Sequence, residues 1–254
     1  MGGAPEAKVE AGIGASVVPG IVPVIAIDGP SGSGKGTVSR ILARRLGWHF
    51  LDSGALYRLV GLAALRRGLP LDDGRRLGAM ARGLEAAFRE DPDGAVRVLL
   101  EGEDVTEALR GEGCAAAASR VAALPEVREA LLERQRAFRR PPGLVADGRD
   151  MGTVVFPDAL LKVFLTASRE VRARRRYNQL KGKGADVNLG AILEELAERD
   201  ARDSARSISP LRPAPDAVTV DTTALTVDQV VDRILALWRE RGGVRGNFGE
   251  GGPS

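Results

Sequence analysis

Short apolar runs alternate with helical patterns along most of the chain. Four runs of this kind are expected to form buried strands: Val24–Ile27, a run that ends at Asp52, Leu144–Ala146 and Leu161–Leu165. Between the first two, apolar residues recur at the spacing of one helix face: Val38, Ile41, Leu42 and Leu46. Strands separated by helices usually form a parallel sheet that helices cover on both faces. The pattern therefore predicts an α/β fold with three layers around a central parallel sheet.

The stretch between about residues 80 and 140 departs from this alternation. Leu84–Phe88 and Val96–Leu100 flank a turn signal at residues 91–94, and together they predict a β-hairpin. Two helical segments are expected to follow, Glu112–Ala123 and Pro125–Arg139. Because this stretch separates strands of the predicted sheet, we expect it to form an inserted lobe.

The two ends of the chain are expected to be disordered tails. Residues 1–20 and 241–254 are rich in glycine and show no sustained apolar period. Before the second tail, Val227–Arg239 keeps an apolar helical face and has Thr226 as its N-cap candidate. The predicted domain spans 21–240, and its core consists of the segments on either side of the lobe, 21–79 and 141–240.

Composition restricts the chemistry that the chain can perform. The 254 residues are 44% hydrophobic, carry a formal charge of +3, and include one histidine, His49, and one cysteine, Cys114. A disulfide framework, a zinc site of four cysteines and histidines and a two-histidine metal site are therefore excluded. The remaining groups suit phosphate handling. The apolar stretch Ile21–Ile27 is too short to cross a bilayer, so we expect a cytoplasmic protein without a membrane partner.

A glycine-rich segment follows the first predicted strand and opens the first predicted helix. It matches the phosphate-binding pattern G-x-x-x-x-G-K and consists of Gly29, Pro30, Ser31, Gly32, Ser33, Gly34, Lys35, Gly36 and Thr37. Glycines let consecutive backbone N–H groups face phosphate oxygens, and Lys35 adds a compact cation. Gly36 stands where Ser or Thr normally supplies a magnesium ligand. Because the guanine-binding Asn-Lys-x-Asp signature is absent, phosphoryl transfer to a small molecule is favoured over a GTPase switch.

Polar residues also follow the second predicted strand. Ser53 is the N-cap candidate of the next helix, and Tyr57 lies one turn further along the same face. Together with Arg58, these residues are suited to bind a monophosphate at a helix N-terminus. The alternative is an ordinary capped helix whose Tyr57 packs in the core.

Two more charged groups have both a functional and a structural interpretation. Asp147, Arg149 and Asp150 follow a buried strand, where ligands gather in open α/β sheets, and the alternative is an ion pair that stabilises a loop. Asp147 is the candidate for orienting magnesium through water. Arg199, Asp203 and Arg206 share one face of a predicted helix, and spacing alone favours a solvated face.

Four segments carry a family resemblance: GPSGSGKGT, LDSGALYR, ADGRDMGTVVFPDA and ERDARDSAR. In this order they resemble the bacterial cytidylate kinases, which are P-loop nucleoside monophosphate kinases. The resemblance covers nearly all of residues 22–240. It implies a P-loop fold whose inserted lobe binds the nucleoside monophosphate. It also implies transfer of the γ-phosphoryl group of ATP to CMP or dCMP, with Mg²⁺ bound to ATP.

The resemblance assigns roles to individual residues. The implied CMP site comprises Ser53, Tyr57, Arg58, Ser119, Arg128, Arg149, Asp150, Arg199, Asp203 and Arg206. In the family pattern, Asp150 helps to read the cytosine edge, and Ser119 and Arg128 match further base-contacting positions. Asp203 with Arg199 would hold the ribose hydroxyls. Arg58, Arg149 and Arg206 would bind the phosphate. Lys35, Arg149 and Arg206 are the implied catalytic residues. Spacing alone would leave Ser119 and Arg128 on the surface.

The densest basic segment has two interpretations. It contains Arg172, Arg174, Arg175, Arg176, Lys181 and Lys183. Such a run can bind nucleic acid, but only 4% of the chain is aromatic and no stacking motif occurs here. In the family, this region resembles the mobile lid that closes over ATP. We therefore expect a lid at about 171–188, with Arg172 and Arg176 as ligands of the ATP phosphates.

Two other functions stay open at this stage. The chain could phosphorylate UMP or another small acceptor, and the base contacts of Asp150, Ser119 and Arg128 would discriminate between these substrates. It could also be an arginine-rich nucleic-acid-binding protein that retains a nucleotide fold. The four motifs favour a kinase that binds ATP and CMP or dCMP and no nucleic acid. We expect it to be a monomer.

Overall fold

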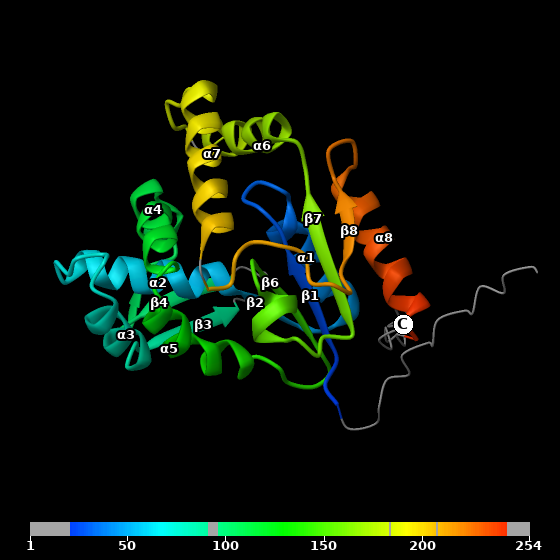
Figure 1. Ribbon diagram of the computed structural model, residues 1–254, viewed down its shortest axis with the longest axis horizontal. Coiled ribbons are helices and arrows are strands. Elements are labelled where there is room, and N and C mark those ends of the chain that lie inside the picture. Colours follow the sequence, from blue (N-terminus) through cyan, green and yellow to red (C-terminus); the bar gives the residue numbers. More distant parts are fainter. Residues whose placement is uncertain (1–20, 91–95, 183, 207, 243–254) are drawn as a thin grey trace, which may run out of the picture.

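The computed structural model describes residues 21–90, 96–182, 184–206 and 208–242 (Figure 1). Apart from Arg241 and Gly242, the predicted tails lie outside these residues. No helix in the described ranges combines the length and the apolar character that crossing a membrane requires.

A five-stranded parallel sheet forms the centre of the molecule. Its strands, in spatial order, are β2 (His49–Asp52), β6 (Leu144–Gly148), β1 (Val24–Asp28), β7 (Leu161–Thr166) and β8 (Val218–Asp221). The four predicted strands and the predicted α/β class are confirmed. The edge strand β8 is missing from the prediction because it has only four residues, of which one is buried.

Alternate residues of β1 enter two different apolar clusters, one on each face of the sheet. Val24 and Ala26 pack with α2 (Ser53–Arg66), whereas Ile25 and Ile27 pack with α1 (Lys35–Leu46) and α8 (Val227–Glu240). Both faces of the strand are therefore buried, which explains why its sequence is apolar at consecutive positions. The result is the predicted arrangement of three layers.

Side-chain caps set the beginnings of α2 and α8. Thr226 is the N-cap of α8, as predicted, and it forms a capping box with Gln229. The predicted N-cap of α2 is wrong. Asp52 takes this position and accepts a hydrogen bond from the Ala55 N–H at 3.0 Å, while Ser53 becomes the first helical residue. The last residue of β2 thus also begins the next helix.

A second, antiparallel sheet lies beside the first (Figure 1). Its strands are β3 (Ala86–Glu90), β4 (Val96–Leu100) and β5 (Glu103–Asp104). The accompanying helices are α3 (Gly74–Arg82), η1 (Ala108–Arg110), α4 (Glu112–Val121) and α5 (Pro125–Arg136). The hairpin is confirmed, although its turn at 91–95 lies outside the described residues, and α3 is an addition to the predicted helices. Val98 and Leu100 belong to the same apolar cluster as Val24 of β1, so the two sheets share one core.

Two helices extend beyond the carboxyl ends of the main strands (Figure 1). They are α6 (Arg169–Lys181) and α7 (Leu189–Ala205). Ala173 and Leu180 of α6 pack with Ile192 and Leu196 of α7 in a small apolar cluster of their own. The predicted lid, 171–188, covers most of α6 and the connection that leads to α7. The boundaries of the lid and of the inserted lobe stay predictions.

Candidate active site

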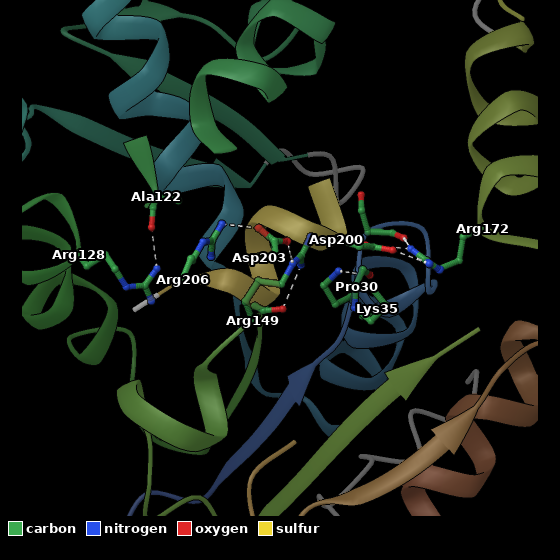
Figure 2. Close-up of polar contacts among 11 residues, drawn as sticks. Pro30, Lys35, Ala122, Arg128, Arg149, Arg172, Asp200, Asp203 and Arg206 are labelled. Atoms are coloured by element: carbon green, nitrogen blue, oxygen red, sulfur yellow. Dashed lines mark hydrogen bonds and ion pairs between the residues drawn. The ribbon is translucent and has the colours of Figure 1, made fainter. Parts of the chain in front are cut away.

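The phosphate-binding loop fits closely against the end of β7. Gly29 has a φ of +152°, and a Cβ at this position would lie 2.1 Å from the carbonyl oxygen of Leu165. Only glycine can therefore occupy the first position of the loop. At the other end, Lys35 is buried, and its Nζ donates to the carbonyl oxygen of Pro30 at 3.0 Å (Figure 2). This bond holds the ammonium group over the loop.

Asp147 lies directly beside the start of α1. A Cβ on Gly36 would come within 3.1 Å of Asp147 Oδ2, so a larger residue here would crowd this carboxylate. Burial and the charge of Arg149 lower the pKa of Lys35. Burial raises the pKa of Asp147, and the charge of Lys35 opposes that rise. Lys35 and Asp147 are therefore two buried groups of opposite charge, each of which favours the charged form of the other.

The surroundings of Asp147 are compatible with a hydrated magnesium ion. Its Oδ1 is buried and has no hydrogen-bond partner among the described residues. An unpartnered carboxylate oxygen is suited to accept a hydrogen bond from a metal-bound water. Within the described residues no group of three or more His, Cys, Asp and Glu side chains forms a metal cage. A single carboxylate beside a phosphate site is a common setting for magnesium, because the substrate phosphates supply the remaining ligands.

Asp203 lies at the centre of a buried ion-pair cluster (Figure 2). The residue is 1% exposed; its Oδ2 accepts from Arg149 Nε at 3.0 Å and its Oδ1 accepts from Arg206. The prediction from spacing alone, that these residues form a solvated helix face, is therefore wrong. The prediction that Arg206 belongs to the same helix is wrong, because α7 ends at Ala205. Arg206 follows the helix directly and donates back to Asp203. Burial by itself would raise the pKa of Asp203, but Arg149, Arg206 and Arg199 hold it below 3.8.

A second buried pair joins Arg128 to Asp150. Arg128 also donates to the carbonyl oxygen of Ala122 at 3.0 Å, and its guanidinium lies 5.7 Å from the centroid of the Tyr57 ring. Burial raises the pKa of Tyr57 to about 12, so its hydroxyl stays protonated at neutral pH.

The surface positions that spacing alone gives to Ser119 and Arg128 are wrong, because these residues are only 4% and 8% exposed. The hydroxyl of Ser119 has no partner among the described residues. A buried polar atom without a partner is costly, so the Ser119 hydroxyl is suited to contact a ligand.

The remaining predicted residues of the CMP site are Arg58, Arg199 and Ser53. Arg58 is half-buried and pairs with Asp52 at 2.7 Å. Burial and the charge of Arg149 lower the pKa of Arg199 to about 10, so this group remains a cation at neutral pH. Its Nε is also buried without a partner among the described residues. Ser53 is buried at the start of α2.

Two arginines of α6 contact the backbone of the phosphate-binding loop. Arg172 donates to the carbonyl oxygen of Ser31 at 3.1 Å and to both oxygens of Asp200. Arg175 donates to the carbonyl oxygen of Ser33 at 3.3 Å. Arg176, the predicted partner of Arg172, instead donates to Gln179. Sequence could not separate Arg175 from Arg176, because residues three and four positions after Arg172 both lie near the same helix face.

The fold and this site define a P-loop phosphotransferase: a phosphate-binding loop with a buried lysine beside a cluster of paired arginines. A family model described as cytidylate kinase matches residues 25–240. The chain belongs to the cytidylate kinase family.

Several curated relatives carry the same description. The cytidylate kinase of Stutzerimonas stutzeri (strain A1501) is 61% identical over 216 residues, which cover 85% of this chain and 94% of the relative. That of Pseudomonas aeruginosa (strain UCBPP-PA14) is 60% identical over 217 residues, covering 85% and 95%. That of Shewanella denitrificans is 55% identical over 214 residues, covering 84% and 94%. The matched segment therefore spans nearly the whole length of each of these kinases.

We expect Asp203→Asn to destabilise the fold in a pH-dependent way. The folded pKa of Asp203 is depressed, so its carboxylate contributes stability above the unfolded pKa, and this contribution is lost as the pH falls through the folded value. At pH 7 the variant should lose about 3 kcal/mol of unfolding free energy, since two buried guanidiniums lose their counter-charge. The difference from wild type should narrow as the pH falls below 3.8.

Urea unfolding at a series of pH values measures this difference. Asp232→Asn is the matched control, because Asp232 pairs with Arg45 but has a 66% exposed side chain. Its cost should stay below about 1 kcal/mol. A loss of unfolding free energy for Asp203→Asn that is no larger than that of the control, or that is independent of pH, would contradict the role of Asp203 as the buried counter-charge of the two guanidiniums.

Proposed function

We propose that the protein transfers the γ-phosphoryl group of ATP to CMP or dCMP, forming ADP and CDP or dCDP. Membership of the cytidylate kinase family supports this reaction. The observation that carries it is the position of the buried Lys35, beside the ion-pair cluster around Asp203 and near enough to Arg149 for their charges to interact. Lys35 is suited to bind the donor phosphates, and the arginines around Asp203 are suited to bind an anionic acceptor.

The donor site would be formed by the loop of residues 29–37. Its backbone N–H groups would surround the phosphates of ATP, and Lys35 would neutralise the transferring end. Asp147 would hold a magnesium ion through water. When bound with ATP, this ion neutralises charge on the phosphates. Arg172 and Arg176 retain their proposed contacts to the ATP phosphates, although Arg172 would have to exchange its bond to Asp200 for one to phosphate.

The acceptor site would use the ion-pair clusters. Arg58, Arg149 and Arg206 present paired donors that match a phosphate. Asp203 with Arg199 would hold the ribose hydroxyls. Asp150 would accept from the exocyclic amine of cytosine, a group that uracil lacks. Ser119 and Arg128 would complete the base contacts, and Tyr57 packs beneath the Arg128 guanidinium.

Catalysis in this site would depend on position and charge. The acceptor phosphate is already an anion at neutral pH, so the reaction needs neither a protein nucleophile nor a general base. Lys35 and the arginines would instead neutralise the developing charge while holding the two phosphates in line. The predicted lid at 171–188 would exclude water, which limits hydrolysis of ATP.

The contacts of the basic helix α6 favour the kinase over a nucleic-acid-binding function. Arg172 and Arg175 point to the backbone of the phosphate-binding loop, where they are engaged with Ser31 and Ser33. A surface for nucleic acid would instead present such groups to solvent. We therefore propose an enzyme without a nucleic-acid partner. Separately from these contacts, we propose that the enzyme is monomeric and cytoplasmic.

A coupled assay of ADP release tests the reaction. With ATP and magnesium present, CMP and dCMP should strongly stimulate ADP formation, whereas UMP, AMP and GMP should stimulate it weakly. A sample without acceptor gives the background hydrolysis. Equal stimulation by UMP would contradict the specificity for cytosine, and the absence of stimulation by every acceptor would contradict the kinase itself.

Asp150→Asn should relax the discrimination between CMP and UMP. An amide can accept from the cytosine amine but can also donate to the uracil carbonyl, so the CMP-to-UMP ratio of kcat/KM should fall about tenfold. The same coupled assay measures this ratio, and Asp232→Asn should leave it unchanged. An unchanged ratio in Asp150→Asn would remove this carboxylate from base selection.

A further inference from the structure

Asp28 links the phosphate-binding loop to the acceptor site by two hydrogen bonds. It is the last residue of β1, directly before Gly29, and only 5% of it is exposed. Its Oδ1 accepts from the Met151 N–H and its Oδ2 from the Gly152 N–H, each at 2.8 Å. Met151 follows Asp150 in sequence. A single carboxylate therefore joins the strand that carries the loop to the segment that carries Arg149 and Asp150.

The backbone alone does not provide this link. Strands β1 and β6 pair in parallel as far as Asp28 and Gly148, and beyond that point the chain leaves the sheet. Met151 then begins the short π-helical turn η2 (Met151–Val155). The first N–H groups of a helical turn have no partner within it. The Asp28 carboxylate accepts hydrogen bonds from two of these N–H groups, one on each oxygen, and so restrains both the position and the orientation of the turn.

Packing does not explain why a carboxylate stands here. The other four residues of β1 are Val24, Ile25, Ala26 and Ile27, all fully buried and apolar. Burial opposes ionisation at this position and raises the pKa of Asp28 to about 7, although the two N–H groups favour the charged form. Burying a carboxyl group costs free energy, and the two hydrogen bonds to the segment after β6 offset that cost.

We propose that Asp28 is a positioning residue that fixes Arg149 and Asp150 relative to the phosphate-binding loop, and so aligns the acceptor with the donor phosphate. This inference rests on the proposed function, because it assumes that the acceptor binds to Arg149 and Asp150. Phosphoryl transfer requires an in-line arrangement of the reacting groups, and a displacement of about 1 Å can reduce the rate about a hundredfold.

The test compares Asp28→Asn with wild type. An amide has one accepting oxygen, so one of the two N–H groups loses its partner while the shape of the side chain is kept. We expect kcat to fall at least about tenfold and the KM for CMP to rise several-fold, with the KM for ATP within about threefold of wild type. A purely structural role would lower stability but leave kcat per folded molecule unchanged.

Two further variants sharpen the result. Asp28→Glu keeps the charge but moves the carboxylate by one methylene, so it should not restore kcat; it also serves as the test variant if Asp28→Asn does not fold. Asp158→Asn is the matched control, because Asp158 also accepts a hydrogen bond near the end of this segment, from the Arg139 guanidinium, yet its side chain is 60% exposed. This control should retain wild-type kinetics.

Hydrogen exchange provides a readout that is independent of activity. Of the amides of Met151 and Gly152, the one that loses its accepting oxygen should exchange at least about tenfold faster in folded Asp28→Asn than in wild type. If their exchange is unchanged, or if kcat stays within twofold of the control, Asp28 is not a positioning residue. If wild type itself shows no CMP-stimulated turnover, the proposed function fails, while the exchange experiment still decides whether Asp28 fixes the turn.

Discussion

The candidate site depends most on the buried ion pairs that the Asp203 carboxylate forms with Arg149 and Arg206. This carboxylate neutralises Arg149 and Arg206 in a region where water is largely excluded, and Arg199 lies close enough for its charge to act on the same carboxylate. Without a counter-charge, guanidiniums held so close together would repel one another strongly in these surroundings. The carboxylate therefore allows several cations to be fixed in place at once, which is what recognition of a compact, highly charged phosphate requires.

The topology of the parallel sheet brings the two halves of the site together. Strands β1 and β6 are neighbours, so the phosphate-binding loop after β1 and the segment after β6 leave the same edge of the sheet side by side. Asp28 is the last residue of β1 and Asp147 the last but one of β6. Asp28 contacts the segment that follows β6, and Asp147 lies close beside the helix that follows the loop after β1. Helix α6 adds a third contact through Arg172 and Arg175. Rigid strand ends thus position the charged groups of the site.

The sequence predicted the features that depend on local pattern, and it failed where tertiary contacts decide. The apolar runs, the phosphate-binding loop and the Thr226 cap follow from short-range rules, and the structure confirms them. Strand β8 and helix α3 were missed because neither has a long periodic pattern. The N-cap of α2 was placed one residue too late, because Asp52 ends a strand and begins a helix at the same time. The burial of Ser119 and Arg128 depends on tertiary packing, of α4 against α2 and of α5 against α3, which spacing along one helix does not reveal. The family resemblance assigns these two residues to the CMP site, and that role stays a prediction.

The separation of a donor site at Lys35 from an acceptor site around Asp203 is the central claim, and Lys35→Met tests it most directly. The substitution keeps a side chain of similar length but removes the cation that, in the proposed function, would hold the donor phosphate. We expect kcat for CDP formation to fall at least about a hundredfold, while calorimetry shows CMP binding within about threefold of wild type. Near-normal turnover would remove Lys35 from the mechanism, and a parallel loss of CMP binding would contradict the separation of the two sites.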